Sequence, residues 1–121
     1  MANNYMPATV YPYFPQALIT ANSEELSELG VSWESDGYMY LEDGSEDWDR
    51  LVALIQAMLL EWNLTDPDNA SKYAYIKAAF YCDKMRQDEF GGFAAFITPA
   101  DTIYHSTDTF IMEQIEKLEG R

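Results

Sequence analysis

Residues 46–62 read EDWDRLVALIQAMLLEW, and this stretch decides how the chain folds. Apolar side chains recur in it mainly at spacings of three and four residues, which is the period of an α-helix with one buried face. They are Trp48, Leu51, Val52, Leu54, Ile55, Met58, Leu59 and Trp62. This broad apolar stripe predicts a central helix that packs along the core, with Ser45 as a candidate N-cap.

The segments before this helix predict three further elements. Residues 1–20 contain three of the five prolines among aromatic residues, which favours an extended or edge-like arm clamped onto the core. Residues 22–30 are typical of a short helix that begins with acidic residues and stops at Gly30. The runs 31–34 and 38–41 flank an Asp-Gly pair, which predicts a β-hairpin.

The segments after the central helix predict two helices and one strand. Residues 65–67 read Thr-Asp-Pro, a helix-start signal, and predict a helix that runs to about Gln87. Its core face would contain Tyr73, Ile76, Phe80 and Met85. Residues 93–98 are uncharged and partly β-prone, which indicates a buried strand. Residues 106–108 predict the cap of a last helix whose apolar stripe contains Phe110, Ile111, Ile115 and Leu118.

These elements define the expected fold class. The chain has 121 residues, of which 48% are hydrophobic and 15% aromatic, so one folded domain spanning residues 1–121 is expected. The strands come as a hairpin plus an isolated segment and do not alternate with helices. We therefore expect an α+β domain in which a small antiparallel sheet, made of the hairpin and one further strand, packs with about four helices.

Few residues are available for catalysis or metal binding. The single cysteine, Cys82, excludes an internal disulfide, and the single histidine, His105, removes most sites that need two imidazoles. A Cys82–His105 dyad is disfavoured, because Cys82 falls inside a predicted helix beside the carboxylate of Asp83. Calcium-loop, phosphate-loop, dinucleotide-binding and nucleophile-elbow patterns are missing. We expect no enzyme activity, catalytic residue, metal or cofactor.

The first residues contain neither Lys nor Arg nor an apolar run of signal-peptide length. No stretch approaches the roughly 18 apolar residues of a membrane span. A cytoplasmic protein without membrane contact is therefore expected.

The informative feature is the distribution of charge. The chain has 21 acidic and 7 basic residues, for a formal net charge of −14. The first 49 residues contain ten acids and neither Lys nor Arg, and short loops join the elements that contain them. We expect these acids to form one negative, partner-binding face, which Lys72, Lys77, Lys84 or Arg86 could neutralise only by lying close to it. The ten acids are Glu24, Glu25, Glu28, Glu34, Asp36, Glu42, Asp43, Glu46, Asp47 and Asp49.

The size of this charge exceeds what solubility requires, which is a net charge of about 2 to 8 for a small domain. A domain of this length is about 35 Å across, and duplex DNA presents about 20 phosphates over that distance. The acid count is similar, although a merely solvated acidic surface is the alternative. Aromatic residues lie among the acids, and either Trp33 or the pair Tyr38 and Tyr40 would face solvent, while Trp48 is assigned to the core.

In size, acidity and the stretch from Glu24 to Asp49, the chain resembles the small acidic DNA-mimic proteins of bacteria and phages. These include monomeric neisserial proteins that bind the histone-like nucleoid protein HU. The resemblance implies a monomer that occupies the DNA-binding site of a basic protein and competes with DNA. Direct binding to nucleic acid is not expected without a basic patch.

Two alternatives share the same charge argument. One is an immunity protein or antitoxin that neutralises a basic nuclease toxin. The other is an acidic anti-restriction or anti-CRISPR inhibitor. Competition by generic duplex DNA would distinguish a mimic from an immunity protein, which would bind one toxin very tightly.

Overall fold

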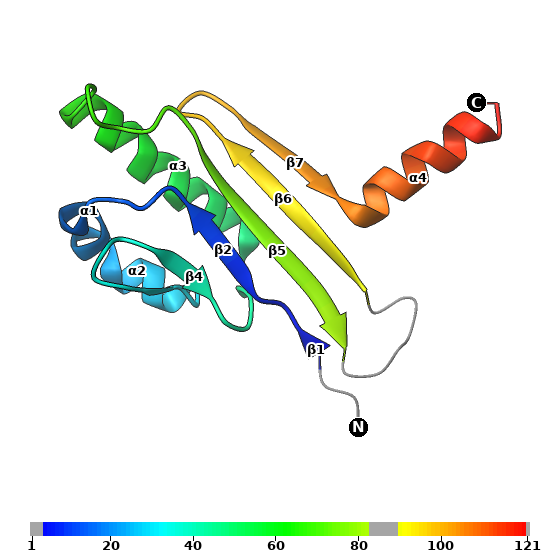
Figure 1. Ribbon diagram of the computed structural model, residues 1–121, viewed down its shortest axis with the longest axis horizontal. Coiled ribbons are helices and arrows are strands. Elements are labelled where there is room, and N and C mark those ends of the chain that lie inside the picture. The colour runs from blue at the N-terminus through cyan, green and yellow to red at the C-terminus, as the bar shows by residue number, and fades with distance from the viewer. Residues whose placement is uncertain (1–3, 83–89, 121) are drawn as a thin grey trace.

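A computed structural model describes residues 4–82 and 90–120 and contains one antiparallel sheet (Figure 1). Six described strands lie side by side in the order β3-β4-β2-β5-β6-β7, and β1 pairs with the far end of β5. The strands are β1 (Asn4–Tyr5), β2 (Ala8–Tyr11), β3 (Ser32–Trp33), β4 (Met39–Leu41), β5 (Ala74–Cys82), β6 (Gly91–Ile97) and β7 (Thr102–Ser106). The helices are α1 (Gln16–Ala21), α2 (Ser23–Glu28), α3 (Trp48–Thr65) and α4 (Thr107–Leu118).

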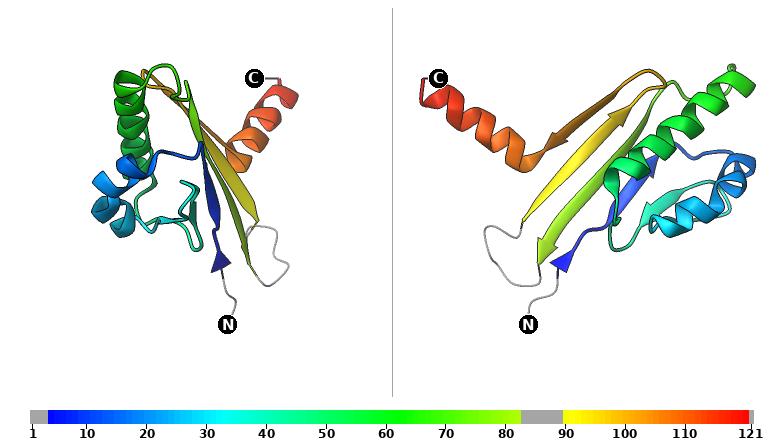
Figure 2. Two further views of the ribbon diagram at one scale, coloured as in Figure 1. Left: turned by 60° about the vertical axis from the view of Figure 1, so that its left-hand side comes forward. Right: turned by 180° about the vertical axis from the view of Figure 1, so that it is seen from behind.

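The helices divide between the two faces of the sheet. Figure 2 shows α1, α2 and α3 on one face, whereas α4 leaves the end of β7 on the opposite side and points away from the strands. The contacts of α3 are with β5 and β6, in the middle of the sheet, and those of α4 are with β6 and β7. The core therefore lies on one side of the sheet only.

The central helix predicted from residues 46–62 is confirmed as α3. Six side chains of the predicted stripe are buried in the core, and Trp48 and Trp62 pack against it partly buried. The predicted cap is displaced by two residues, because the Asp47 carboxylate, and not Ser45, accepts a hydrogen bond from the Arg50 backbone N–H at 3.0 Å. The Ser45 hydroxyl instead accepts a hydrogen bond from the Asp47 N–H at 3.3 Å.

The short helix and the hairpin are also confirmed, as α2 and as β3 paired with β4. The hairpin turn contains Gly37 at φ 95°, a left-handed conformation that favours glycine. Its carbonyl accepts a hydrogen bond from the Phe14 N–H at 3.2 Å, which ties the turn to the N-terminal segment.

The prediction of an extended arm over residues 1–20 is right only in part. The extended piece becomes β2, which pairs with β4 on one side and β5 on the other and is therefore interior to the sheet. Phe14, which follows β2 in the same N-terminal segment, is buried and packs against Trp62, with ring centroids 5.5 Å apart. The segment then forms α1, which the proline-rich pattern did not predict.

The helix predicted from Thr65 to about Gln87 is wrong. The start signal produces a single turn, in which the Ala70 N–H donates to the Asp66 carbonyl at 2.9 Å, and the chain then enters β5. Within β5, Ala74 and Ile76 are buried, whereas Tyr75 and Lys77, which alternate with them, are more exposed, which is the two-residue period of a strand. Cys82 consequently lies in a strand, and the part of this prediction beyond residue 82 lies outside the described residues.

The expected small sheet, made of the hairpin and one further strand, is wrong as well. The chain is α+β, but its sheet includes β2, β5 and β7 in addition to the predicted strands. The predicted strand at residues 93–98 is confirmed as β6, and it pairs with β5 and β7 along its two edges. A half-buried strand needs such partners for its backbone N–H and carbonyl groups, so a larger sheet follows from its burial.

The burial of α3 predicts where single substitutions unfold the protein. Leu51 and Ile55 are each 0% exposed, and truncation to alanine removes core contacts and leaves a cavity. We expect Leu51→Ala or Ile55→Ala to lower the free energy of unfolding by about 2–5 kcal/mol in a denaturant titration. Leu60 on the same helix is 43% exposed, so Leu60→Ala serves as the control with a small effect. An unchanged denaturation midpoint for both core variants would contradict the packing described.

Candidate functional site

Three glutamates of α2 surround a hollow beside the start of α3. Glu24, Glu25 and Glu28 line this hollow, of about 420 Å³, together with Arg50. The guanidinium of Arg50 forms two salt bridges, Nε to Glu25 Oε1 and Nη2 to Glu28 Oε2, each 3.1 Å long. The hydrogen bonds to Glu28 and Glu25 raise the pKa of Arg50. Arg50 therefore holds two of the three α2 carboxylates in place.

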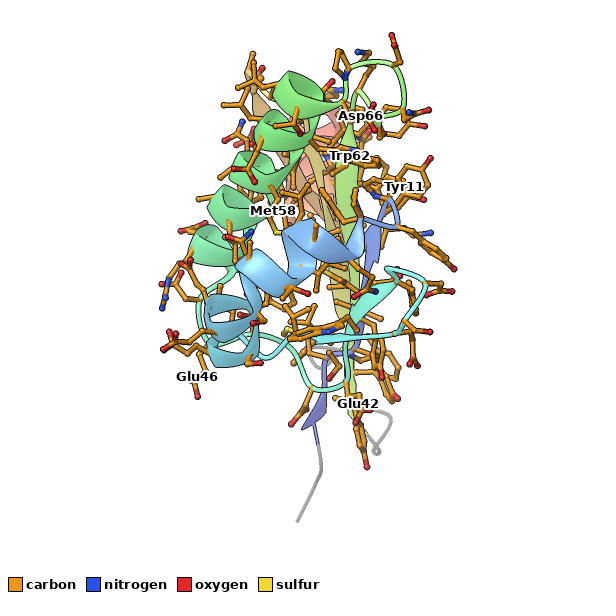
Figure 3. The ribbon with its side chains drawn as sticks, turned by 90° about the vertical axis from the view of Figure 1, so that its left-hand side faces the viewer. Tyr11, Glu42, Glu46, Met58, Trp62 and Asp66 are labelled. Carbon is orange, nitrogen blue, oxygen red and sulfur yellow. The ribbon has the colours of Figure 1, made fainter. Side chains whose placement is uncertain are left out.

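The loop between β4 and α3 adds four more acids to this part of the molecule. The carbonyl of Gly44 lies close to Gly30, just after α2, so the loop passes the C-terminal end of that helix. Figure 3 shows Glu46 beside α2 and Glu42 below β4, at the same end of the protein. We call the combined set the acidic surface. It consists of Glu24, Glu25, Glu28, Glu42, Asp43, Glu46 and Asp47.

The other three predicted site residues are not part of this set, although Glu34 and Glu42 both act on the pKa of Tyr40. Glu34 and Asp36 belong to the hairpin turn, where the Asp36 carboxylate accepts a hydrogen bond from the Tyr38 N–H at 3.1 Å. Asp49 lies beside Tyr104 of β7 on the other flank of α3. The pKa of Tyr104 is raised by desolvation and by the charge and hydrogen bond of Asp49. The ten acids are therefore distributed over the acidic surface and two separate places.

Aromatic residues near the acids divide between the two faces of the sheet. Tyr38 and Tyr40 stack with centroids 5.4 Å apart on the face away from the core, whereas Trp33 packs against the core. The charge of Glu34, then burial and Glu42, raises the pKa of Tyr40. Trp48 packs against the core and meets Phe93 edge-on at 4.8 Å, as its assignment to the core predicts.

The bases expected as possible neutralisers do not pair with acids where they are described. Lys72 Nζ donates to Asn63 Oδ1 at 3.3 Å and to the Pro67 carbonyl at 3.4 Å. Lys77 lies over the Tyr75 ring, 5.6 Å from its centroid. Lys84 and Arg86 lie outside the described residues. In the described part of the chain, both salt bridges involve Arg50.

The sequence did not single out Arg50, because the segment without Lys or Arg ends at residue 49, one position before it. The capping position of Asp47 could nevertheless have placed Arg50. Asp47 precedes a helix as a capping residue, so the third residue after it lies in the first turn, at the same end of the helix as the acids. Arg50 could therefore have been placed beside the acidic segment, although its partners in α2 depend on tertiary structure.

Metal ligation is not supported by the residues that the structure describes. Among residues 4–82 and 90–120, no group of three or more His, Cys, Asp or Glu side chains is placed to hold a metal ion. The His105 ring lies edge-on to Phe110 at 5.9 Å. No described helix is long and apolar enough to cross a membrane. What the arrangement can do is attract positive charge through exposed carboxylates on fixed elements.

Comparisons of the chain with protein-family models, with curated proteins and with solved structures find no match.

The two salt bridges of Arg50 predict a salt-dependent loss of stability on its replacement. In Arg50→Gln, the α2 carboxylates lose their partner and repel one another, so the denaturation midpoint should fall at low ionic strength. The deficit should shrink as salt screens the repulsion. Arg50→Lys, which keeps the charge without the two-pronged geometry, should recover much of the low-salt loss. Equal salt dependence of Arg50→Gln and the unmodified protein would contradict this role.

Proposed function

We propose that this protein is a DNA mimic, whose acidic surface binds the DNA-binding site of a basic protein and competes with DNA for it. The observation that carries the proposal is the set of three glutamates around the hollow beside Arg50, together with four exposed acids in the loop before α3, which passes the end of α2. One guanidinium pairs with two of them, so seven negative charges and one positive charge give a net −6 for this surface.

The scaffold under the acidic surface favours a defined arrangement of charge. Leu26 and Leu29 are buried, so the helix that contains the three glutamates is fixed to the core. The Asp47 cap fixes the other end of the surface to α3. Carboxylates held on packed elements lose less conformational freedom on binding than those of a disordered acidic tail. This supports recognition of a particular basic site rather than general attraction alone.

The expected binding mode is electrostatic and needs neither catalysis nor a cofactor. Opposite charges steer the two proteins together, so association should be fast at low salt and slower as ionic strength rises. Direct binding to DNA is opposed by like charge. A cytoplasmic DNA-binding protein such as a histone-like nucleoid protein has the chemistry that this surface requires, in keeping with the resemblance to DNA mimics.

A matched pair of charge variants tests the proposal. The surface variant is Glu24→Gln, Glu42→Gln, Asp43→Asn and Glu46→Gln, which spares the Asp47 cap. The control variant removes four charges outside the acidic surface and outside α4, through Glu61→Gln, Asp66→Asn, Asp68→Asn and Asp101→Asn. We expect the surface variant to associate with a histone-like nucleoid protein at least about tenfold more slowly at low salt, because it loses steering. The control should slow much less, and duplex DNA should compete with the unmodified protein in the same assay.

Two results would contradict this function. Equal slowing by both variants would mean that net charge matters and the acidic surface does not. Tight binding to a single basic nuclease that duplex DNA does not displace would favour an immunity protein.

A further inference from the structure

The face of the sheet opposite α1, α2 and α3 is apolar and aromatic. Residues paired directly across neighbouring strands share a face, and the pairs Tyr11↔Tyr75, Tyr75↔Phe96 and Phe96↔Ile103 run across β2, β5, β6 and β7. Tyr11 stacks on Tyr75 at 4.9 Å and on Tyr73 at 5.6 Å, and Tyr73 stacks on Phe96 at 5.4 Å. We call this side of β2, β5, β6 and β7 the open face.

The last helix has an apolar stripe that its own chain leaves exposed. Phe110, Ile111, Ile115 and Leu118 lie along one side of α4, and none of the helix residues is buried. A helix of 12 residues is marginal in water without packing. The Ser106 hydroxyl accepts a hydrogen bond from the Thr109 N–H at 3.1 Å, so the start of the helix is well defined. The stripe therefore requires a partner for its stability.

A hollow between the first turn of α4 and the open face offers an apolar receiving site. Its volume is about 560 Å³, and small residues such as Gly92 and Ala94 are among those that line it. His105 and Phe110 contribute aromatic rings to it, and Lys77 contributes the one charged side chain. The hollow can accept side chains of an apolar helix.

We propose that the occupant is a second copy of this chain, with α4 of each copy packed on the open face of the other. The exposed apolar side chains are Tyr11, Tyr73, Phe96, Ile103, Phe110, Ile111, Ile115 and Leu118. At roughly 150–250 Å² for each aromatic side chain in full, and less for each Ile or Leu, their exposed fractions amount to on the order of 700 Å². A standard stable interface covers about 800 Å² on each partner. The area is therefore large enough for a stable dimer. Because both copies use the same patch, the dimer is two-fold symmetric.

The distribution of charge permits this approach between two chains of net charge −14. Glu34 and Glu42 lie near Tyr40 of β4, separated from β5 and β6 by β2. Helix α2, whose three glutamates belong to the acidic surface, lies on the other side of the sheet (Figure 2), so Glu42 is the member of that surface nearest to the outer tyrosines of β4. The hollow instead is lined by Lys77. Helix α4 contains three acids, Asp108, Glu113 and Glu116, and one base, Lys117. The helix of the second copy is therefore net negative and meets the positive charge of Lys77.

This inference departs from the monomer that the resemblance to DNA mimics implies. Acidity alone favours separate molecules, but it does not account for an uncovered aromatic face and an unpacked amphipathic helix in the same chain. The dimer surface is also distinct from the acidic surface, so the two proposals can fail independently.

The oligomeric state of the full chain tests the dimer. Light scattering and sedimentation should give a mass of twice 13.9 kDa for the unmodified protein. Ile115→Asp should raise the dissociation constant at least about a hundredfold, because the dimer loses this side chain twice. Leu64→Asp is the matched control, since Leu64 is 74% exposed at the end of α3, and it should remain dimeric. A monomeric unmodified protein would overturn the proposal.

Further measurements locate the interface. Ile103→Asp changes the sheet half of the same contact and should also give a folded monomer, whose circular dichroism differs from that of the unmodified protein by no more than the loss of α4. Hydrogen exchange should show slow α4 amides in the dimer and fast ones in both monomeric variants. Dimers that persist in Ile115→Asp and Ile103→Asp, or that dissociate equally in Leu64→Asp, would overturn the assigned surface. The four-charge acidic-surface variant should remain dimeric, and Ile115→Asp should keep salt-dependent partner binding.

Discussion

The packing of α3 against the middle of the sheet is the interaction on which the rest of the structure depends. Leu51, Ile55 and Met58 of this helix are buried in the core, and the helix contacts β5 and β6. The same helix begins at the Asp47 cap and places Arg50, in its first turn, within salt-bridge distance of α2. The position of the acidic surface is therefore a consequence of apolar burial, since the carboxylates themselves repel one another and would not assemble alone.

A sheet covered on one face leaves the chain with two different exposed sides. One side presents α1, α2, α3 and most of the clustered carboxylates, and the other presents α4, stacked rings and Lys77. This division resolves an apparent conflict in the composition, in which a chain of charge −14 also has 15% aromatic residues. Several of those aromatics cover the side that the core does not use, so the aromatic content is not a measure of core size.

Local patterns in the sequence were sufficient for some elements and insufficient for others. The central helix, the hairpin, α2 and α4 follow from apolar spacing, an Asp-Gly turn and capping residues, all of which act within a few positions. The strand β5 was missed because Tyr73, Ile76 and Phe80 fit a helical spacing, while Ala74 and Ile76 equally fit a strand. The choice between helix and strand depends on the strands that pair with β5 on either side, and these lie far away in the sequence.

The candidate site was predictable to a similar extent. Loop connections were enough to place α2 and the loop before α3 together. The position of the hairpin turn depends instead on where β3 and β4 sit in the sheet, and that of Asp49 depends on how α3 packs beside Tyr104 of β7. Arg50 pairs with Glu25 and Glu28 across more than twenty positions of sequence, a contact set by how α2 and α3 pack.

The placement of α4 across the sheet from α2 has a consequence for stoichiometry. Two chains joined through their open faces would hold their carboxylate clusters pointing outward in opposite directions. Such an assembly would be a bivalent ligand, able to bridge two basic molecules or to engage two sites on one oligomer. Its apparent strength would then be set by the effective concentration of the second site as much as by the contacts at the first.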